Sequence, residues 1–151
     1  MSLITEPETI NFPEAHYVFM ESQGHIQTIA PQTWQSVGAL GREIEKGNRI
    51  VGAAALYKTK PGVYRAGFML AAPPVNLPND LTYAKLPAGK YTRFTLNGPY
   101  DQLPEATRRA FEVVVEKRIP LRDDFNIEHY LKDSMTTPAD QLVTEILFPT
   151  A

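Results

Sequence analysis

The alternation of apolar and polar residues predicts the same succession of elements twice along the chain. Strand-like segments at residues 8–12 and 15–21 precede residues 31–46, where apolar side chains recur at helical spacing. Two further strand-like segments follow, at residues 50–58 and 63–70, joined by a Pro-Gly turn that is typical of a hairpin. The first half of the chain therefore predicts the order strand, helix, strand, strand.

The second half of the chain repeats this order. Its predicted strands lie at residues 81–86, 90–96, 126–131 and 142–148. Its helix is expected to take Asp101 as N-cap and to end before Pro120, because proline cannot continue a helix. The apolar stripe predicted to be buried on this helix consists of Leu103, Ala106, Ala110, Phe111 and Val114. Thr107 and Arg108 are expected outside that stripe.

Identities at a nearly constant offset indicate a duplicated unit. The residues that recur 73 or 74 positions apart are Pro13 and Pro87, Tyr17 and Tyr91, Gly24 and Gly98, and Tyr57 and Tyr130. We predict one domain over residues 1–151, with repeats at about 8–70 and 81–149 and a proline-containing linker at 71–80. The predicted fold is α+β, a tandem strand–helix–strand–strand repeat with pseudo-twofold symmetry, whose antiparallel sheets and two main helices surround a central cleft.

Composition narrows the possible functions. The 151 residues are 43% hydrophobic and 21% charged, with a formal net charge of -2, so a basic field for nucleic acid is not expected. The absence of cysteine excludes disulfides, zinc–thiolate sites and thiol nucleophiles. The three histidines show no metal-ligand spacing, and no metal or cofactor is expected. No segment has the pattern of a signal peptide or a membrane span, which predicts a cytoplasmic protein without membrane contact.

The two copies differ at a position that carries chemistry. At an offset of 73, Ala55 corresponds to Glu128, so a small residue in one copy is a carboxylate in the other. Strand alternation places Glu128 and Tyr130 on one face, with Ala55 and Tyr57 on the matching face of the first copy. A carboxylate among aromatic rings would suit a bound cation, and burial would raise its pKa. The alternative is that Glu128 lies on the solvent face of the sheet.

Further residues are candidates for the same site. Glu145 is a second candidate for a buried carboxylate, although an exposed strand glutamate is the preferred interpretation. Trp34 belongs either to the core or to the wall of a pocket that the first helix covers. The other aromatic candidates for such a wall are Phe94, Tyr64, Phe68 and Phe111.

Four segments in the second half resemble a known family. They are Leu86-Pro87-Ala88-Gly89-Lys90-Tyr91, Gly98-Pro99-Tyr100-Asp101-Gln102-Leu103, Ile127-Glu128-His129-Tyr130 and Thr144-Glu145-Ile146-Leu147-Phe148-Pro149. In this order they resemble the GyrI-like small-molecule-binding domain, which is also the effector-binding domain of AraC-type and MerR-type multidrug-responsive regulators. The resemblance implies a central pocket for bulky hydrophobic cations and a buried glutamate in a Glu-x-Tyr motif. That motif matches Glu128 and Tyr130, while Ile127 replaces the usual aromatic residue.

The resemblance leads to a functional expectation with two alternatives. The expected function is a stand-alone multidrug-binding or effector-binding module for hydrophobic cationic small molecules. The chain length leaves no room for a helix-turn-helix domain, so direct nucleic-acid binding is not expected. The first alternative is a hydrolase of electrophilic small molecules that uses the same glutamate. The second is a protein-interaction module like a gyrase inhibitor. A homodimer and a regulatory protein partner are left open.

Overall fold

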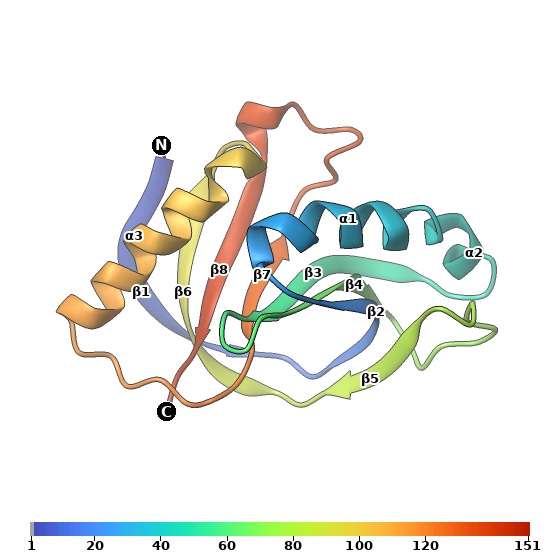
Figure 1. Ribbon diagram of the computed structural model, residues 1–151, viewed down its shortest axis with the longest axis horizontal. Helices are drawn as coiled ribbons and strands as arrows, with labels where there is room; N and C mark the ends of the chain where they lie inside the picture. The colour runs from blue at the N-terminus through green and yellow to red at the C-terminus, as the bar shows by residue number, and fades with distance from the viewer. Residues whose placement is uncertain (1) are drawn as a thin grey trace. The chain divides into compact units, whose positions relative to one another are not determined.

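A computed structural model describes residues 2–151, which form two compact units (Figure 1). The N-terminal unit is Pro13–Ala88, and the C-terminal unit consists of residues 2–12 and Gly89–Ala151. Each unit contains four strands joined in antiparallel pairs and a helix packed on its strands. This arrangement confirms the predicted α+β class and the repeated strand–helix–strand–strand order.

The N-terminal unit is built around the hairpin that the Pro-Gly turn predicts. Its elements are β2 (Ala15–Gln23), α1 (Ile26–Gly38), α2 (Gly41–Glu45), β3 (Ile50–Lys58), β4 (Val63–Leu70) and β5 (Thr82–Leu86). The strands lie in the order β3-β4-β2-β5, and α1 packs against β2 and β4. Val37 on α1 and Ile44 on α2 are fully buried, which fixes the apolar side of the helical segment.

The C-terminal unit has the same plan with a longer first strand. Its elements are β1 (Ser2–Phe12), β6 (Gly89–Asn97), the 3-10 turn η1 (Tyr100–Gln102), α3 (Leu103–Glu116), β7 (Asn126–Tyr130), the 3-10 turn η2 (Ala139–Gln141) and β8 (Val143–Pro149). The strands lie in the order β1-β6-β8-β7. The helix α3 contacts β1 and β6, and its buried residues share a core with Phe94, Leu96, Ile146 and Phe148.

Each unit takes one edge strand from the opposite half of the sequence. The strand β1 pairs with β6, and β5 pairs with β2 (Figure 1). Only Pro13-Glu14 separates β1 from β2, and only Pro87-Ala88 separates β5 from β6. Neither dipeptide contains the Gly or Asn that a two-residue hairpin turn requires, so the chain does not fold back at these points. Each edge strand therefore pairs with the strand that directly precedes the helix of the other repeat.

The turn that precedes the helix has the same geometry in both repeats. Gly24 follows β2 and Gly98 follows β6, with φ angles of 140° and 152°. Their amide N–H groups donate to distant carbonyls, Gly24 to Gly62 and Gly98 to Leu142. A positive φ is costly for residues with a Cβ atom, which explains glycine at both equivalent positions.

The helical predictions need three corrections. Residues 31–46 do not form one helix: α1 begins earlier, at Ile26, and the low helix propensity of Gly38 and Gly41 coincides with the break before α2. Asp101 does not cap α3, because η1 occupies this position and Gln102 precedes the helix without a side-chain cap. Phe111 is 48% exposed, and Val113 is buried instead. The buried side of α3 consists mainly of Ala and Val.

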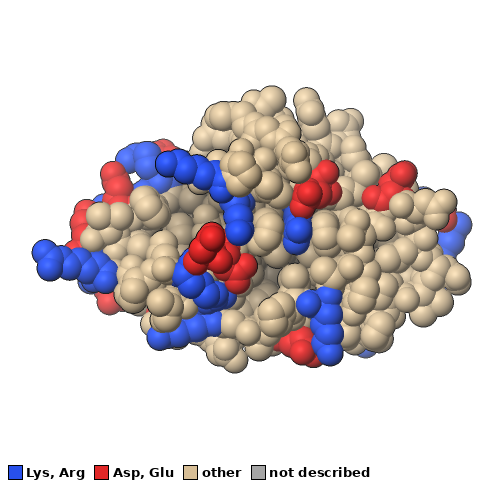
Figure 2. Space-filling model, turned by 60° about the horizontal axis from the view of Figure 1, so that its bottom comes forward, with Lys and Arg blue, Asp and Glu red and all other residues tan. Residues whose placement is uncertain are grey.

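On the face drawn in Figure 2, acidic and basic side chains are interspersed rather than gathered by sign. Within residues 2–151, no helix has the length and apolar character to cross a bilayer. The same residues contain no cluster of three or more histidine, aspartate or glutamate side chains that could hold a metal ion.

Candidate functional site

Strand register places Glu128 and Tyr130 on the helix-covered face of the C-terminal unit. Glu128 lies directly opposite Ile146, and Tyr130 lies opposite Thr144. Ile146 belongs to the core that α3 covers, so its cross-strand neighbour Glu128 faces the same side. The predicted alternation along β7 is therefore confirmed, and the interpretation of Glu128 as a residue of the open sheet face is wrong.

The carboxylate of Glu128 is held by a neighbouring phenol in a desolvated environment. Tyr130 donates its hydroxyl proton to Glu128 Oε1 over 2.8 Å. Burial raises the pKa of Glu128, and the hydrogen bond from Tyr130 opposes that effect. The residue nevertheless keeps part of its surface accessible. Glu128 thus combines partial access with an environment that favours its neutral form.

The tyrosine that holds the carboxylate contacts a second tyrosine. The rings of Tyr100 and Tyr130 meet edge to face, with centroids 5.2 Å apart. Burial and the negative charge of Asp133 raise the pKa of the Tyr100 phenol, which therefore stays neutral at physiological pH. Sequence reasoning did not identify Tyr100 as a site residue. The available signal was its place directly after Gly98-Pro99, a turn that brings the next residue to the start of α3.

Two phenylalanines of the C-terminal unit occupy different environments. Phe94 is 1% exposed and lies in the core, edge to face with Phe148 at 5.9 Å. Phe111 projects from the margin of α3, and its ring centroid lies 6.1 Å from that of Phe148. Phe148 is two residues after Ile146 on β8, so it lies on the same face as Ile146 and Glu128. Phe111 therefore presents an accessible aromatic surface beside that face.

The candidates in the N-terminal unit also gather on a helix-covered face. Tyr57 lies opposite Tyr64 with the two rings stacked at 6.3 Å, and Trp34 on α1 donates its indole N–H to Tyr64 over 2.7 Å. Trp34 also contacts Phe68 edge to face, while Ala55 is fully buried opposite Ala66. The prediction that these residues and Glu128 line one pocket stays a prediction.

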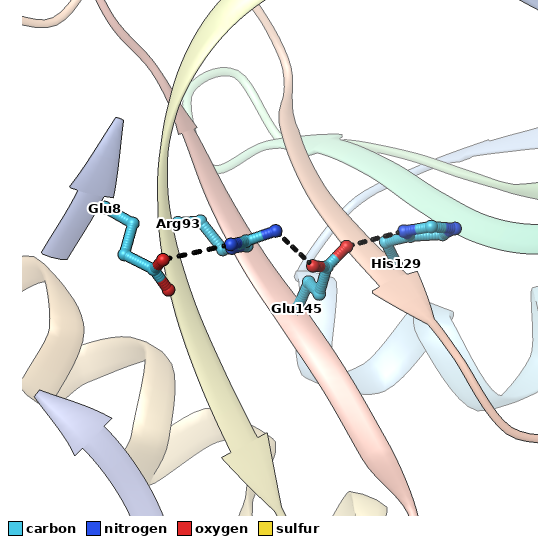
Figure 3. Close-up of polar contacts among 4 residues, drawn as sticks. All are labelled: Glu8, Arg93, His129 and Glu145. Carbon is cyan, nitrogen blue, oxygen red and sulfur yellow. Dashed lines mark hydrogen bonds and ion pairs between the residues drawn. The ribbon is translucent and has the colours of Figure 1, made fainter. Parts of the chain in front are cut away.

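Glu145 lies on the opposite face and has other partners. It takes part in a row of polar contacts that crosses the C-terminal unit from Glu8 through Arg93 and Glu145 to His129 (Figure 3). The distances along this row are 3.1 Å, 3.0 Å and 2.8 Å. The side chain of Glu145 is only 12% exposed, so the preferred interpretation of an exposed strand glutamate is wrong. We call these four residues the charged row.

The charged row keeps Glu145 ionised. Its hydrogen bond with His129 lowers the pKa of Glu145, and the nearby positive charge of Arg93 adds to this effect, while burial acts in the opposite direction. The two glutamates on the two faces therefore have opposite pKa shifts. Within residues 2–151, Glu128 makes no ion pair, so its environment is the more suitable of the two for an external cation.

Solved structures share this fold at low sequence identity. The EcmrR C-terminal domain superimposes with a TM-score of 0.74 at 18% identity, covering 97% of each chain. EcmrR in a complex with DNA gives a TM-score of 0.77 at 17% identity, and there the chain covers 56% of the EcmrR length. SAV2435 bound to tetraphenylphosphonium gives 0.70 at 14% identity, covering 97% of this chain and 94% of that one.

A hydrolase from Listeria innocua also has a similar fold, with a TM-score of 0.63 at 10% identity and coverage of 97% of this chain and 92% of that one. No curated protein sequence is significantly similar to this chain. The family model for the GyrI-like small molecule binding domain, in contrast, matches residues 5–151. That match spans both repeats, from β1 to the end of the chain. The chain therefore belongs to the GyrI-like small-molecule-binding family.

Proposed function

We propose that this protein binds bulky hydrophobic cations and that Glu128 supplies the negative charge that meets them. The observation that carries the proposal is the desolvated carboxylate of Glu128, held by Tyr130, whose ring contacts Tyr100. The family is one of small-molecule-binding domains, and SAV2435, with a similar fold, has been solved with the lipophilic cation tetraphenylphosphonium.

The energetics of this arrangement favour a ligand that is both cationic and apolar. A charge about 4 Å from the carboxylate gains on the order of 4 kcal/mol at an effective dielectric constant near 20. An aromatic face adds about 2 kcal/mol when the cation is desolvated. A strongly hydrated cation would lose much of this gain as desolvation cost. A lipophilic onium ion carries a diffuse charge and has little hydration to lose.

The first prediction concerns Glu128→Gln. Titration with tetraphenylphosphonium, followed calorimetrically at neutral pH, should give an affinity in the micromolar range, about -8 kcal/mol. Glutamine keeps the size of the side chain and removes its charge, so we expect affinity to fall about a hundredfold, or about 3 kcal/mol.

A matched control separates loss of charge at the site from loss of charge elsewhere. Glu45→Gln removes an exposed carboxylate on α2 and should leave the affinity unchanged. Both variants should melt cooperatively. Unchanged binding in Glu128→Gln would show that this carboxylate does not meet the cation.

The hydrolase alternative rests on the same residue. A carboxyl group with a raised pKa beside a phenol is suited to general acid–base catalysis. The hydrolase from Listeria innocua has a similar fold. Incubation with an activated ester or an epoxide would distinguish the two functions. Catalytic turnover that disappears in Glu128→Gln would favour the enzyme, whereas stoichiometric binding without turnover favours the binding protein.

A further inference from the structure

The two units differ in whether the buried hydroxyl groups between helix and sheet make hydrogen bonds. In the N-terminal unit, Thr33 on α1 donates to Ser22 on β2 over 2.8 Å, and Tyr64 on β4 accepts the indole N–H of Trp34. Both hydroxyl positions in that unit therefore have partners from the opposing element. A buried hydroxyl without such a partner costs free energy, so this pairing is the expected state.

The equivalent hydroxyls of the C-terminal unit are unpaired. Thr107 stands 74 residues after Thr33, but Leu96 replaces the serine at the corresponding place in β6. Thr144 lies opposite Tyr130 just as Tyr64 lies opposite Tyr57, so it occupies the position of Tyr64. Within residues 2–151, the buried hydroxyl oxygens of Thr107 and Thr144 have no hydrogen-bond partner.

Thr144 is the unpaired hydroxyl closest in register to the proposed site. It is 0% exposed and shares a face with Glu128, which lies diagonally across the β7–β8 pair. Diagonal neighbours lie roughly 7–8 Å apart, and their Cβ atoms are somewhat closer. A single nitrogen that makes two hydrogen bonds of about 2.9 Å can connect groups at that separation once the glutamate side chain extends toward it.

We propose that the site selects cations that carry N–H groups, namely primary and secondary ammonium ions, over quaternary ions of the same skeleton. This inference rests on the proposed cation-binding function and refines its ligand class. One N–H donates to the carboxylate of Glu128, and the second donates to the hydroxyl of Thr144. The ammonium takes the place of the Tyr130 phenol at Glu128, and displacement of the Tyr130 ring, the cross-strand neighbour of Thr144, opens the way to the hydroxyl.

The chemistry explains why a hydroxyl rather than a second carboxylate suits this position. A threonine oxygen accepts a hydrogen bond without adding charge, so it distinguishes ions that carry an N–H group from ions that do not. The negative charge that attracts both kinds of ion comes from Glu128. A quaternary ion satisfies Glu128 but leaves the Thr144 hydroxyl unpaired in both the free and the bound protein. The ammonium gains a hydrogen bond that the quaternary ion cannot make, and this gain is the source of the expected selectivity.

The test compares 1-pyrenemethylammonium with its N,N,N-trimethyl counterpart, two fluorescent cations with one aromatic skeleton. Fluorescence titration of the full-length protein should show the ammonium binding about tenfold more tightly. In Thr144→Val, a nearly isosteric change, that ratio should fall to about one. Thr144→Ser restores the hydroxyl and should restore the ratio. Thr95→Val, on the opposite face of β6, is the matched control and should retain it.

The outcomes separate this inference from the proposed function. If both ions bind and their affinity ratio is the same in the wild type, Thr144→Val and Thr144→Ser, the selectivity assigned to Thr144 is overturned while cation binding stands. If the quaternary ion binds as tightly as the ammonium in the wild type, the inference also fails. If neither ion binds, the cation-binding function fails as well. Melting temperatures of the three variants establish that each is folded.

Discussion

At the scale of single residues, burial and hydrogen bonding act on Glu128 in opposite directions. Burial favours the neutral carboxyl group, whereas the phenol of Tyr130 favours the carboxylate by donating to it, and burial is the larger effect. A cation that enters the site reverses this balance, because it stabilises the ionised form. Cation binding and proton release are therefore coupled at this side chain.

The coupling has a definite sign. Below the raised pKa of Glu128, a permanently charged ligand must displace a proton, so its affinity should weaken about tenfold for each unit that the pH falls. Above that pKa the affinity should reach a plateau. Tetraphenylphosphonium keeps its charge at all pH values, so calorimetric titrations with it across the range from about 4 to 8 report on the protein alone. An affinity that is flat or that rises toward low pH would contradict the coupling.

The geometry around the proposed site was partly predictable from the sequence. Strand alternation and the comparison of the two copies identified Glu128 and Tyr130, because both features are local along the chain. The contact between Tyr100 and Tyr130 and the unpaired hydroxyl of Thr144 were not predicted. These features depend on how η1, β7 and β8 meet in space, which no single sequence period encodes.

At the scale of elements, the charged row connects all four strands of the C-terminal unit. It runs from Glu8 on β1 to His129 on β7, the five-residue strand that also carries Glu128 on its other face. The Phe12 ring packs edge to face on His129 with centroids 5.4 Å apart. The row therefore supports β7 from the face opposite to the proposed site.

We expect Glu145→Gln to destabilise the protein by about 1–3 kcal/mol at neutral pH, since it removes charge-assisted hydrogen bonds to Arg93 and His129. The pKa of Glu145 is lowered by folding, so its stabilisation is present above the ordinary carboxyl pKa and is lost as pH falls through the lowered value. Denaturant titrations should show a smaller difference in the free energy of unfolding between Glu145→Gln and wild type at about pH 3 than at about pH 7.

The matched comparison for this prediction is Glu8→Gln at the outer end of the row. Its side chain is 55% exposed, so solvent screens its ion pair with Arg93. We expect a loss of less than about 1 kcal/mol. Equal losses in the two variants would indicate that burial of Glu145 does not strengthen its contacts.

The strands were easier to predict than the helices. The predicted segments 50–58 and 63–70 agree with β3 and β4, because alternating or apolar runs between clear turns define a strand well. The first helix was misplaced because Pro31 was taken for its start, whereas it lies inside α1. The charged row could not be predicted, since it joins residues 8, 93, 129 and 145 through pairing across four strands.

At the scale of the whole chain, the exchange of edge strands links the two halves of the sequence. A fragment that ends at Asn79 contains β1 but not its partner β6, and the remaining fragment contains β5 but not its partner β2. Neither fragment alone can complete the sheet of either unit. Unpaired edges of this kind favour association.

The two fragments, residues 1–79 and 80–151, should therefore bind each other when they are produced separately and mixed. Size-exclusion chromatography should show a one-to-one complex with the circular dichroism of the intact protein. A second fragment that begins at Gly89 lacks β5 and should bind more weakly, which provides the control. Independent elution of two folded monomers would contradict the role assigned to the exchanged strands.

The short links at Pro13-Glu14 and Pro87-Ala88 also bear on how such a protein could arise. A polypeptide with one repeat would have an edge strand that cannot turn back onto its own neighbour, so it would donate that strand to a sister molecule and accept one in return. Gene fusion then makes this strand exchange intramolecular, and the effective concentration of each edge strand at its partner sheet becomes high. Once both repeats lie in one chain, their sequences can diverge independently, and one repeat can carry an acidic residue that the other lacks.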